Sequence, residues 1–101
     1  MIDFQKILKE IWENKNTKKF NIDDINLEFC LTFDELAEAF RAYHKKLPDI
    51  GEELADVAIY LLSLSKMLDV DLEKEIVKKI KKNKQRTYKK VGGVNVKVKG
   101  K

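Results

Sequence analysis

The chain has 101 residues, of which 44% are hydrophobic and 38% are charged, and its formal net charge is +4. These values fit one globular domain and exclude a disordered chain. No apolar run reaches the roughly 18 residues of a membrane span, and Asp3, Lys6 and Glu10 interrupt the start of the chain, where a leader peptide would be apolar.

One proline and four glycines, three of them in the last ten residues, leave few chain breakers, so an all-α fold is predicted. Apolar side chains recur at helical spacing over residues 2–14, which predicts a first helix. The next segment, residues 14–21, is polar and has no period, and we expect a loop there. Asp23 or Asp24 is a good N-cap for the helix that follows.

The second helix is predicted over residues 24–46 and has two different faces. Its main stripe consists of large apolar side chains. They are Phe29, Phe33, Leu36, Phe40, Tyr43 and Leu47. The opposite face places Glu35 and Glu38 among apolar neighbours rather than among lysines, so we expect this helix to be covered on two sides. The single cysteine, Cys30, lies in the same apolar context and is expected to be buried, which agrees with a reducing cytoplasm.

A short turn around Pro48 and Gly51 leads to a third helix, predicted over residues 50–68. No charged residue occurs from Val57 to Ser65, and a helix that is apolar nearly all round is buried. A bundle of 101 residues has difficulty burying one helix on every side. We therefore expect the chain to self-associate, most simply as a two-fold homodimer.

The fourth helix is predicted over residues 72–88, with Asp71 as its N-cap, and it carries a narrow apolar stripe among many lysines. Beyond it, residues 91–94 indicate a turn, and residues 94–98 alternate like a short strand. A small hairpin and a loose tail are both compatible with this pattern.

The predicted fold is thus an all-α four-helix bundle, with a helical domain over residues 1–90 and a basic tail or hairpin over residues 91–101. Charge is divided unevenly along it. Residues 1–73 carry 9 basic and 16 acidic side chains, whereas residues 74–101 carry 12 basic side chains and 1 acidic side chain. Two explanations fit this asymmetry: an acidic metal site that works with a basic segment holding phosphates, or a basic tail for nucleic acid.

Two acidic motifs lie on consecutive helices, Glu35-Leu-Ala-Glu38 and Glu53-Leu-Ala-Asp56. The i, i+3 spacing within each motif points both carboxylates to one side of the helix. Helices joined by so short a turn pack antiparallel, so the four carboxylates are expected to form one cluster. Four such anions repel one another unless a cation lies among them. Because Mg²⁺ prefers oxygen ligands, these residues are predicted to bind Mg²⁺ or Mn²⁺.

Few other residues indicate chemistry. Tyr60, one turn beyond Asp56 and on the same side of the helix, is the aromatic residue that we expect in a substrate pocket. The only histidine, His44, has Arg41 three residues before it, so no Glu-x-x-His pair of the di-iron kind is present. No glycine-rich phosphate loop, Cys/His metal spacing or Ser/His/Asp arrangement occurs either.

Three segments together resemble the MazG-like nucleotide pyrophosphohydrolases of the all-α NTP pyrophosphatase group. They are Phe33–Phe40, Pro48–Leu62 and Leu72–Arg86. The resemblance covers about residues 20–90 and implies a helical bundle that forms dimers or dimers of dimers. It also implies Mg²⁺-dependent cleavage of nucleoside triphosphates between the α and β phosphates, which yields the monophosphate and pyrophosphate.

The resemblance also implies roles for individual positions. The carboxylates that match metal ligands are Glu35, Glu38, Glu53 and Asp56. Asp34 stands where the family often has glutamate. The residues that match positions near substrate phosphate or sugar are Lys79, Asn83 and Arg86. These three share one helix face at i, i+4, i+7 spacing. Glu38 is our choice for the general base that takes the proton of the attacking water.

Two other functions are compatible with the sequence. One is a non-catalytic helical dimer module whose basic segment, residues 74–101, binds nucleic acid. That segment has a single aromatic residue, Tyr88, which is poor for base stacking, so nucleic acid is not the partner that we favour. The other is a catalytically silent bundle that keeps the fold without the activity. Dependence on a divalent metal distinguishes the hydrolase from both.

Overall fold

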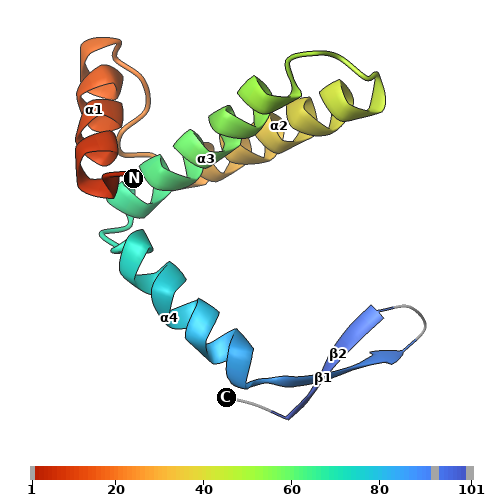
Figure 1. Ribbon diagram of the computed structural model, residues 1–101. Coiled ribbons are helices and arrows are strands. Elements are labelled where there is room, and N and C mark those ends of the chain that lie inside the picture. Colours follow the sequence, from red (N-terminus) through yellow and green to blue (C-terminus); the bar gives the residue numbers. More distant parts are fainter. Residues whose placement is uncertain (1, 92–93, 100–101) are drawn as a thin grey trace. The chain divides into compact units, whose positions relative to one another are not determined.

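The computed structural model describes residues 2–91 and 94–99, with side chains up to residue 86. The described residues form four helices, which confirms the helical prediction, and two short strands (Figure 1). The elements are α1 (Phe4–Thr17), α2 (Ile25–His44), α3 (Ile50–Met67), α4 (Leu72–Gln85), β1 (Thr87–Val91) and β2 (Val94–Lys99). No helix in this part of the chain combines the length and the hydrophobicity that crossing a bilayer would require.

Aspartate caps fix where three of the helices begin. The Asp24 carboxylate accepts the backbone N–H of Leu27 at 3.0 Å, and Asp71 accepts that of Lys74 at 3.1 Å. Asp3 does the same for α1. Each bond satisfies a backbone donor that has no partner inside its helix. Asp24, rather than Asp23, is therefore the N-cap of α2, and the prediction for Asp71 is confirmed.

The first three helices end in the same way, with a left-handed residue that is not glycine. Lys19, Lys46 and Asp69 have φ angles of 59°, 55° and 55°. In each case the next residue donates its N–H back over the last turn, as Leu47 does to the Ala42 carbonyl at 2.8 Å. This Schellman closure stops the helix. It explains why α2 ends at His44, two residues before the predicted end.

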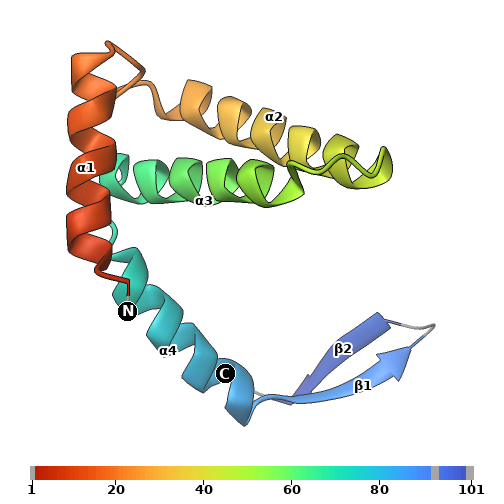
Figure 2. The same cartoon turned by 45° about the horizontal axis from the view of Figure 1, so that its top comes forward.

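Contacts divide the chain into two compact units, Met1–Val70 and Asp71–Lys101. The predicted boundary between residues 90 and 91 stays a prediction. In the first unit α2 and α3 run antiparallel side by side, as the short turn between them predicts. Figure 2 shows α1 lying across the end of this pair where α2 begins and α3 finishes.

On α2 the buried apolar side chains that face α3 are small. Ala39 and Ala42 are each 3% exposed, and Leu64 is 5% exposed. The large side chains of the predicted main stripe of α2 face outward instead, from Phe29 at 41% exposed to Tyr43 at 69%. Small residues let two helices approach closely, and this leaves no room for large aromatic rings between them.

The single chain does not bury α3 on every side, as expected for a bundle of this length: Leu54 is 55% exposed and Leu61 is 47% exposed. The prediction that Cys30 is buried is wrong, since this thiol is exposed. The physical reason is the same for both: an apolar neighbourhood predicts burial only where a further layer covers it, and the described chain supplies none there. Self-association stays a prediction.

In the second unit, α4 has no buried residue, and Val77 is 57% exposed. The predicted helix extended to residue 88, but α4 ends at Gln85 because Arg86 has an extended backbone and β1 starts directly after it. Strands β1 and β2 pair antiparallel, with Val91 opposite Val94. The glycines of the predicted turn, at 92 and 93, lie outside the described residues.

Candidate functional site

Three of the four predicted metal ligands come together at the α2–α3 contact. Glu35 of α2 and Glu53 and Asp56 of α3 each offer a carboxylate oxygen, and these oxygens lie within 4.8 Å of one another. The i, i+3 spacing of Glu53 and Asp56 puts both on one side of α3, and the antiparallel packing sets Glu35 against them. We call Glu35, Glu53 and Asp56 the acidic cluster; the two motifs predict four carboxylates together, and these are the three that lie this close.

Glu38, the fourth predicted ligand, does not belong to this close group. It lies one turn further along α2, and its carboxylate accepts a hydrogen bond from the Arg41 guanidinium. The pair is about half exposed on both sides. Its charge still reaches the acidic cluster, because it is one of the causes that raise the pKa of Glu35 and Glu53. The catalytic role of Glu38 stays a prediction.

The acidic cluster is electrostatically strained. Partial burial raises the pKa of Glu35 above its ordinary value, and the negative charges of Asp56, Glu38 and Asp34 raise it further. Removal from water also raises the pKa of Glu53, and the surrounding carboxylates, first among them Asp49, add to this effect. The described residues give these carboxylates no ion pair with a lysine or arginine. Hard oxygen donors so placed suit Mg²⁺ or Mn²⁺.

A pocket of about 480 Å³ opens beside the acidic cluster, in the corner between α1, α2 and α3. Asp56 belongs to both the cluster and the pocket lining. Apolar walls come from all three helices and from the loop before α2. They are Ile11, Phe20, Leu31 and Ile59. A concave, mostly apolar site of this volume with a few polar groups is typical of small-molecule binding.

Tyr60, the predicted pocket residue, does line this pocket. It lies four residues after Asp56, on the same side of α3. Burial raises the pKa of its hydroxyl, and the charges of Glu35, Glu28 and Asp56 raise it further. These effects favour the neutral form of the hydroxyl, and the charges responsible come from the acidic cluster and from a further carboxylate, that of Glu28.

A buried ionic cluster lies at the inner end of the pocket, and sequence reasoning missed it. The Lys15 ammonium of α1 pairs with the Glu28 carboxylate of α2 at 2.7 Å, and the Ser63 hydroxyl of α3 donates to the same oxygen at 2.8 Å. Lys15 also donates to Ser63. The available signal was a glutamate inside an apolar run: Glu28 precedes Glu35 by seven residues, as Asp56 precedes Ser63, so both clusters lie on the same helix faces.

The predicted phosphate-binding residues lie in the second unit. Lys79 and Asn83 are exposed on α4, and Arg86, directly after this helix, donates to the Asn83 side chain at 3.4 Å. Their spacing places them on one side of α4. Their contact with a substrate stays a prediction.

A model of the MazG-like family matches residues 21–99. This match covers most of the chain. The chain belongs to the MazG-like family. The comparisons with curated proteins and with solved structures give no match.

The MazG-like region spans α2, α3, α4 and both strands, and it contains the acidic cluster. The family is related to NTP pyrophosphatases and generally uses divalent metals, so the predicted resemblance is confirmed at that level. Helix α1 precedes the matched region. One wall of the pocket and one member of the ionic cluster therefore come from outside it.

Proposed function

We propose that this MazG-like chain is a Mg²⁺-dependent nucleoside triphosphate pyrophosphohydrolase, which also accepts Mn²⁺. It would cleave an NTP or dNTP between the α and β phosphates, giving the monophosphate and pyrophosphate. One observation carries this proposal: carboxylates of a MazG-like helix pair converge to within 4.8 Å at the edge of a pocket of nucleotide-like size. The converging carboxylates would bind the ion, and the pocket would bind the nucleoside part of the substrate.

Glu35, Glu53 and Asp56 would hold the metal. Glu38, the fourth predicted carboxylate, would lie beside this group. When bound, the ion neutralises the triphosphate and orients it for attack by water. The residues of the chain then have three tasks: to accept the proton of the water, to hold the phosphates and to place the nucleoside.

We assign Glu38 as the general base that takes the proton of the attacking water, because it stands outside the close group and is about half exposed to solvent. Water attacks a phosphorus of the α–β bridge, Glu38 takes its proton, and the bridging P–O bond breaks. Lys79 and Arg86 would bind phosphate oxygens, Arg86 with its planar fork, and Asn83 would bind the sugar. Tyr60 would contact the nucleoside in the pocket.

The active form that we propose is a homodimer or a dimer of dimers. The outward stripe of α2 and one side of α3 each have several large apolar side chains that are exposed. They are Phe33, Leu36, Phe40, Tyr43, Leu54 and Leu61. Large apolar side chains exposed in this number on a small domain indicate an interaction surface. A second copy would cover it, as an isologous two-fold contact does.

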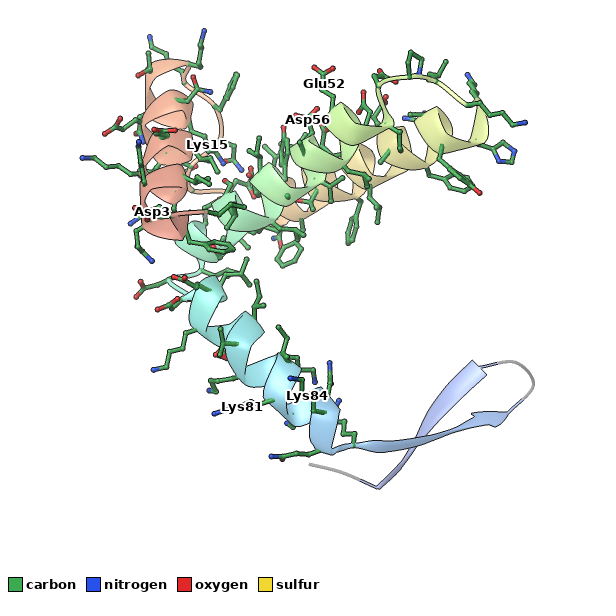
Figure 3. All side chains as sticks on the ribbon, viewed as in Figure 1. Asp3, Lys15, Glu52, Asp56, Lys81 and Lys84 are labelled. Atoms are coloured by element: carbon green, nitrogen blue, oxygen red, sulfur yellow. The ribbon has the colours of Figure 1, made fainter. Side chains whose placement is uncertain are left out.

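The test is pyrophosphate release from the eight common NTPs and dNTPs, with Mg²⁺ and with a chelator. Glu53→Gln is expected to lower kcat/KM for the best substrate at least about 100-fold, because it removes one charged ligand from the metal. The matched control is Glu52→Gln, which removes a neighbouring exposed carboxylate outside the acidic cluster (Figure 3). Turnover that survives the chelator, or equal activity of both variants, would contradict the proposal.

A second candidate is nucleic-acid binding, favoured by the lysine-rich, fully exposed surface of α4. It would be independent of the metal and unaffected by Glu53→Gln, and it would weaken steeply with salt. A filter-binding titration at two salt concentrations distinguishes it from hydrolysis.

A further inference from the structure

The ionic cluster of Lys15, Glu28 and Ser63 joins three helices at a single point, and each of its members is nearly removed from solvent. Lys15 is 7% exposed, Glu28 1% and Ser63 2%. The second Glu28 oxygen accepts from the Asn21 amide at 3.1 Å. Among the described residues no buried side-chain nitrogen or oxygen is left without a hydrogen-bond partner. A buried charge set of this kind is stable only while every partner is present.

Lys15 is the most deeply buried residue by which helix α1 contacts α2 and α3. Lys15 is the only buried residue of α1, and its side chain reaches toward the α2–α3 pair (Figure 3). The ammonium also lies 5.8 Å from the ring centre of Trp12, one turn earlier on the same helix. The ionic contact is therefore the most deeply buried part of the α1 interface, beside half-buried apolar side chains such as Ile7 and Leu8.

The position of α1 against α2 and α3 determines the shape of the pocket. Ile11 and Asn14 belong to its α1 wall, and Ile59 and Tyr60 belong to its α3 wall. Ser63 and Asp56 are seven residues apart on α3, which is about 10 Å along a helix. The pocket thus lies between the ionic cluster at its inner end and the acidic cluster at its outer end. If α1 left its seat, the wall would go with it, and the acidic cluster would be unchanged.

We propose that Lys15 is a positioning residue: by pairing with Glu28 and Ser63 it holds α1 in place and so completes the pocket for the nucleoside part of the substrate. This inference rests on the proposed pyrophosphohydrolase function. It gives α1, which lies outside the matched family region, a task of its own in substrate binding.

The rival role for Lys15 is direct contact with substrate phosphates. Its surroundings argue against this role. Its ammonium already donates to Glu28 and Ser63 and lies 3.9 Å from the Met67 sulfur, and its side chain is only 9% exposed. A lysine has three donors, so little capacity is left for a phosphate.

The two roles predict different kinetics. Lys15→Met leaves Glu28 buried without its partner, so α1 should leave its seat and KM should rise at least about tenfold, with kcat within about twofold. The double variant Lys15→Met/Glu28→Gln removes both charges and should restore most of the wild-type KM. A phosphate-binding lysine would give a fall in kcat as well, and the double variant would not recover.

The fluorescence of Trp12, the only tryptophan, can show without any substrate whether α1 is in its place. Its fluorescence should shift toward that of a solvent-exposed indole in Lys15→Met and return in the double variant. Lys66→Met is the matched control: Lys66 also lies over the Trp12 ring, at 5.9 Å, but it is exposed and forms no ion pair with Glu28. Its KM should equal that of the wild type.

The outcomes separate the two claims. A wild type that releases no pyrophosphate from any nucleotide overturns the proposed function and this inference with it. An active wild type whose KM is unchanged by Lys15→Met, or not restored by the double variant, overturns the inference alone. If Lys15→Met loses its helical circular dichroism, Ser63→Ala takes its place: a raised KM at constant kcat supports the inference, and an unchanged KM overturns it.

Discussion

Two groups of buried or half-buried carboxylates lie on the same faces of α2 and α3. They differ in whether a basic side chain of the chain neutralises them. At one end Glu28 is matched by the Lys15 ammonium and the Ser63 hydroxyl. At the other, Glu35 and Glu53 face each other with Asp56 and receive no lysine or arginine from the described residues. The first cluster is complete within the chain. Under the proposed function the second would be completed by a cation from outside, and this difference would separate a structural site from a functional one.

The largest effect expected from this comparison is on stability. Lys15→Met should lower the free energy of unfolding by about 3–5 kcal/mol, because it leaves the Glu28 charge buried and unpaired. Glu35→Gln, in the metal-free protein, should raise it by less than about 1 kcal/mol, since it removes repulsion at a partly exposed site. Urea titrations with chelator measure both. Changes of the same sign would show that the two clusters do not differ in this way.

The sequence predicts much of the acidic cluster because its signal is local. Two i, i+3 pairs of acids on helices joined by a short turn suffice to bring Glu35, Glu53 and Asp56 together. The helix starts are also local, since the Asp24 and Asp71 caps act over three residues. The ionic cluster could not be found in this way. Lys15 and Ser63 are 48 residues apart, and only the packing of α1 brings them into contact.

The outward stripe of α2 shows a second limit of sequence patterns. Periodicity identifies Phe33, Phe40 and Tyr43 as one apolar face, but it does not say whether that face meets α3 or another molecule. The structure assigns the α2–α3 contact to Ala39 and Ala42, whose small side chains give a weaker hydrophobic signal. The sequence predicts cover on both sides of α2, and within the single chain the side with the large residues is exposed.

A smaller effect is expected from pH. The pKa of Glu35 and that of Glu53 are raised above 4.5 in the folded chain, so the folded state binds protons more tightly than the unfolded state. Without metal, the contribution of Glu35 and Glu53 to stability should be greatest below pH 4.5, their ordinary pKa. It should fall as the pH rises from 4.5 through the raised values. Saturating Mg²⁺ should remove this loss, because the ion replaces the protons.

Thermal unfolding between pH 4 and pH 7, with chelator and with Mg²⁺, measures this effect. Glu35→Gln should flatten the metal-free profile, and Glu52→Gln, outside the acidic cluster, should leave it unchanged. A metal-free stability that rises across this interval for the wild type, and equally for Glu35→Gln, would mean that other carboxylates dominate.

The smallest effect concerns Glu38. Its carboxylate is paired with an arginine, as Glu28 is with a lysine, but it is exposed and lies beside the acidic cluster. Its partner Arg41 is about half exposed, so Arg41→Ala should change the unfolding free energy by less than about 1 kcal/mol.

Glu38→Gln tests whether Glu38 is a general base or a metal ligand. A base would lose kcat while the affinity for Mg²⁺, measured by calorimetry, stays within about threefold of the wild type; a ligand would lose both together. Because Glu38 stands outside the close group of three oxygens, we expect the first result.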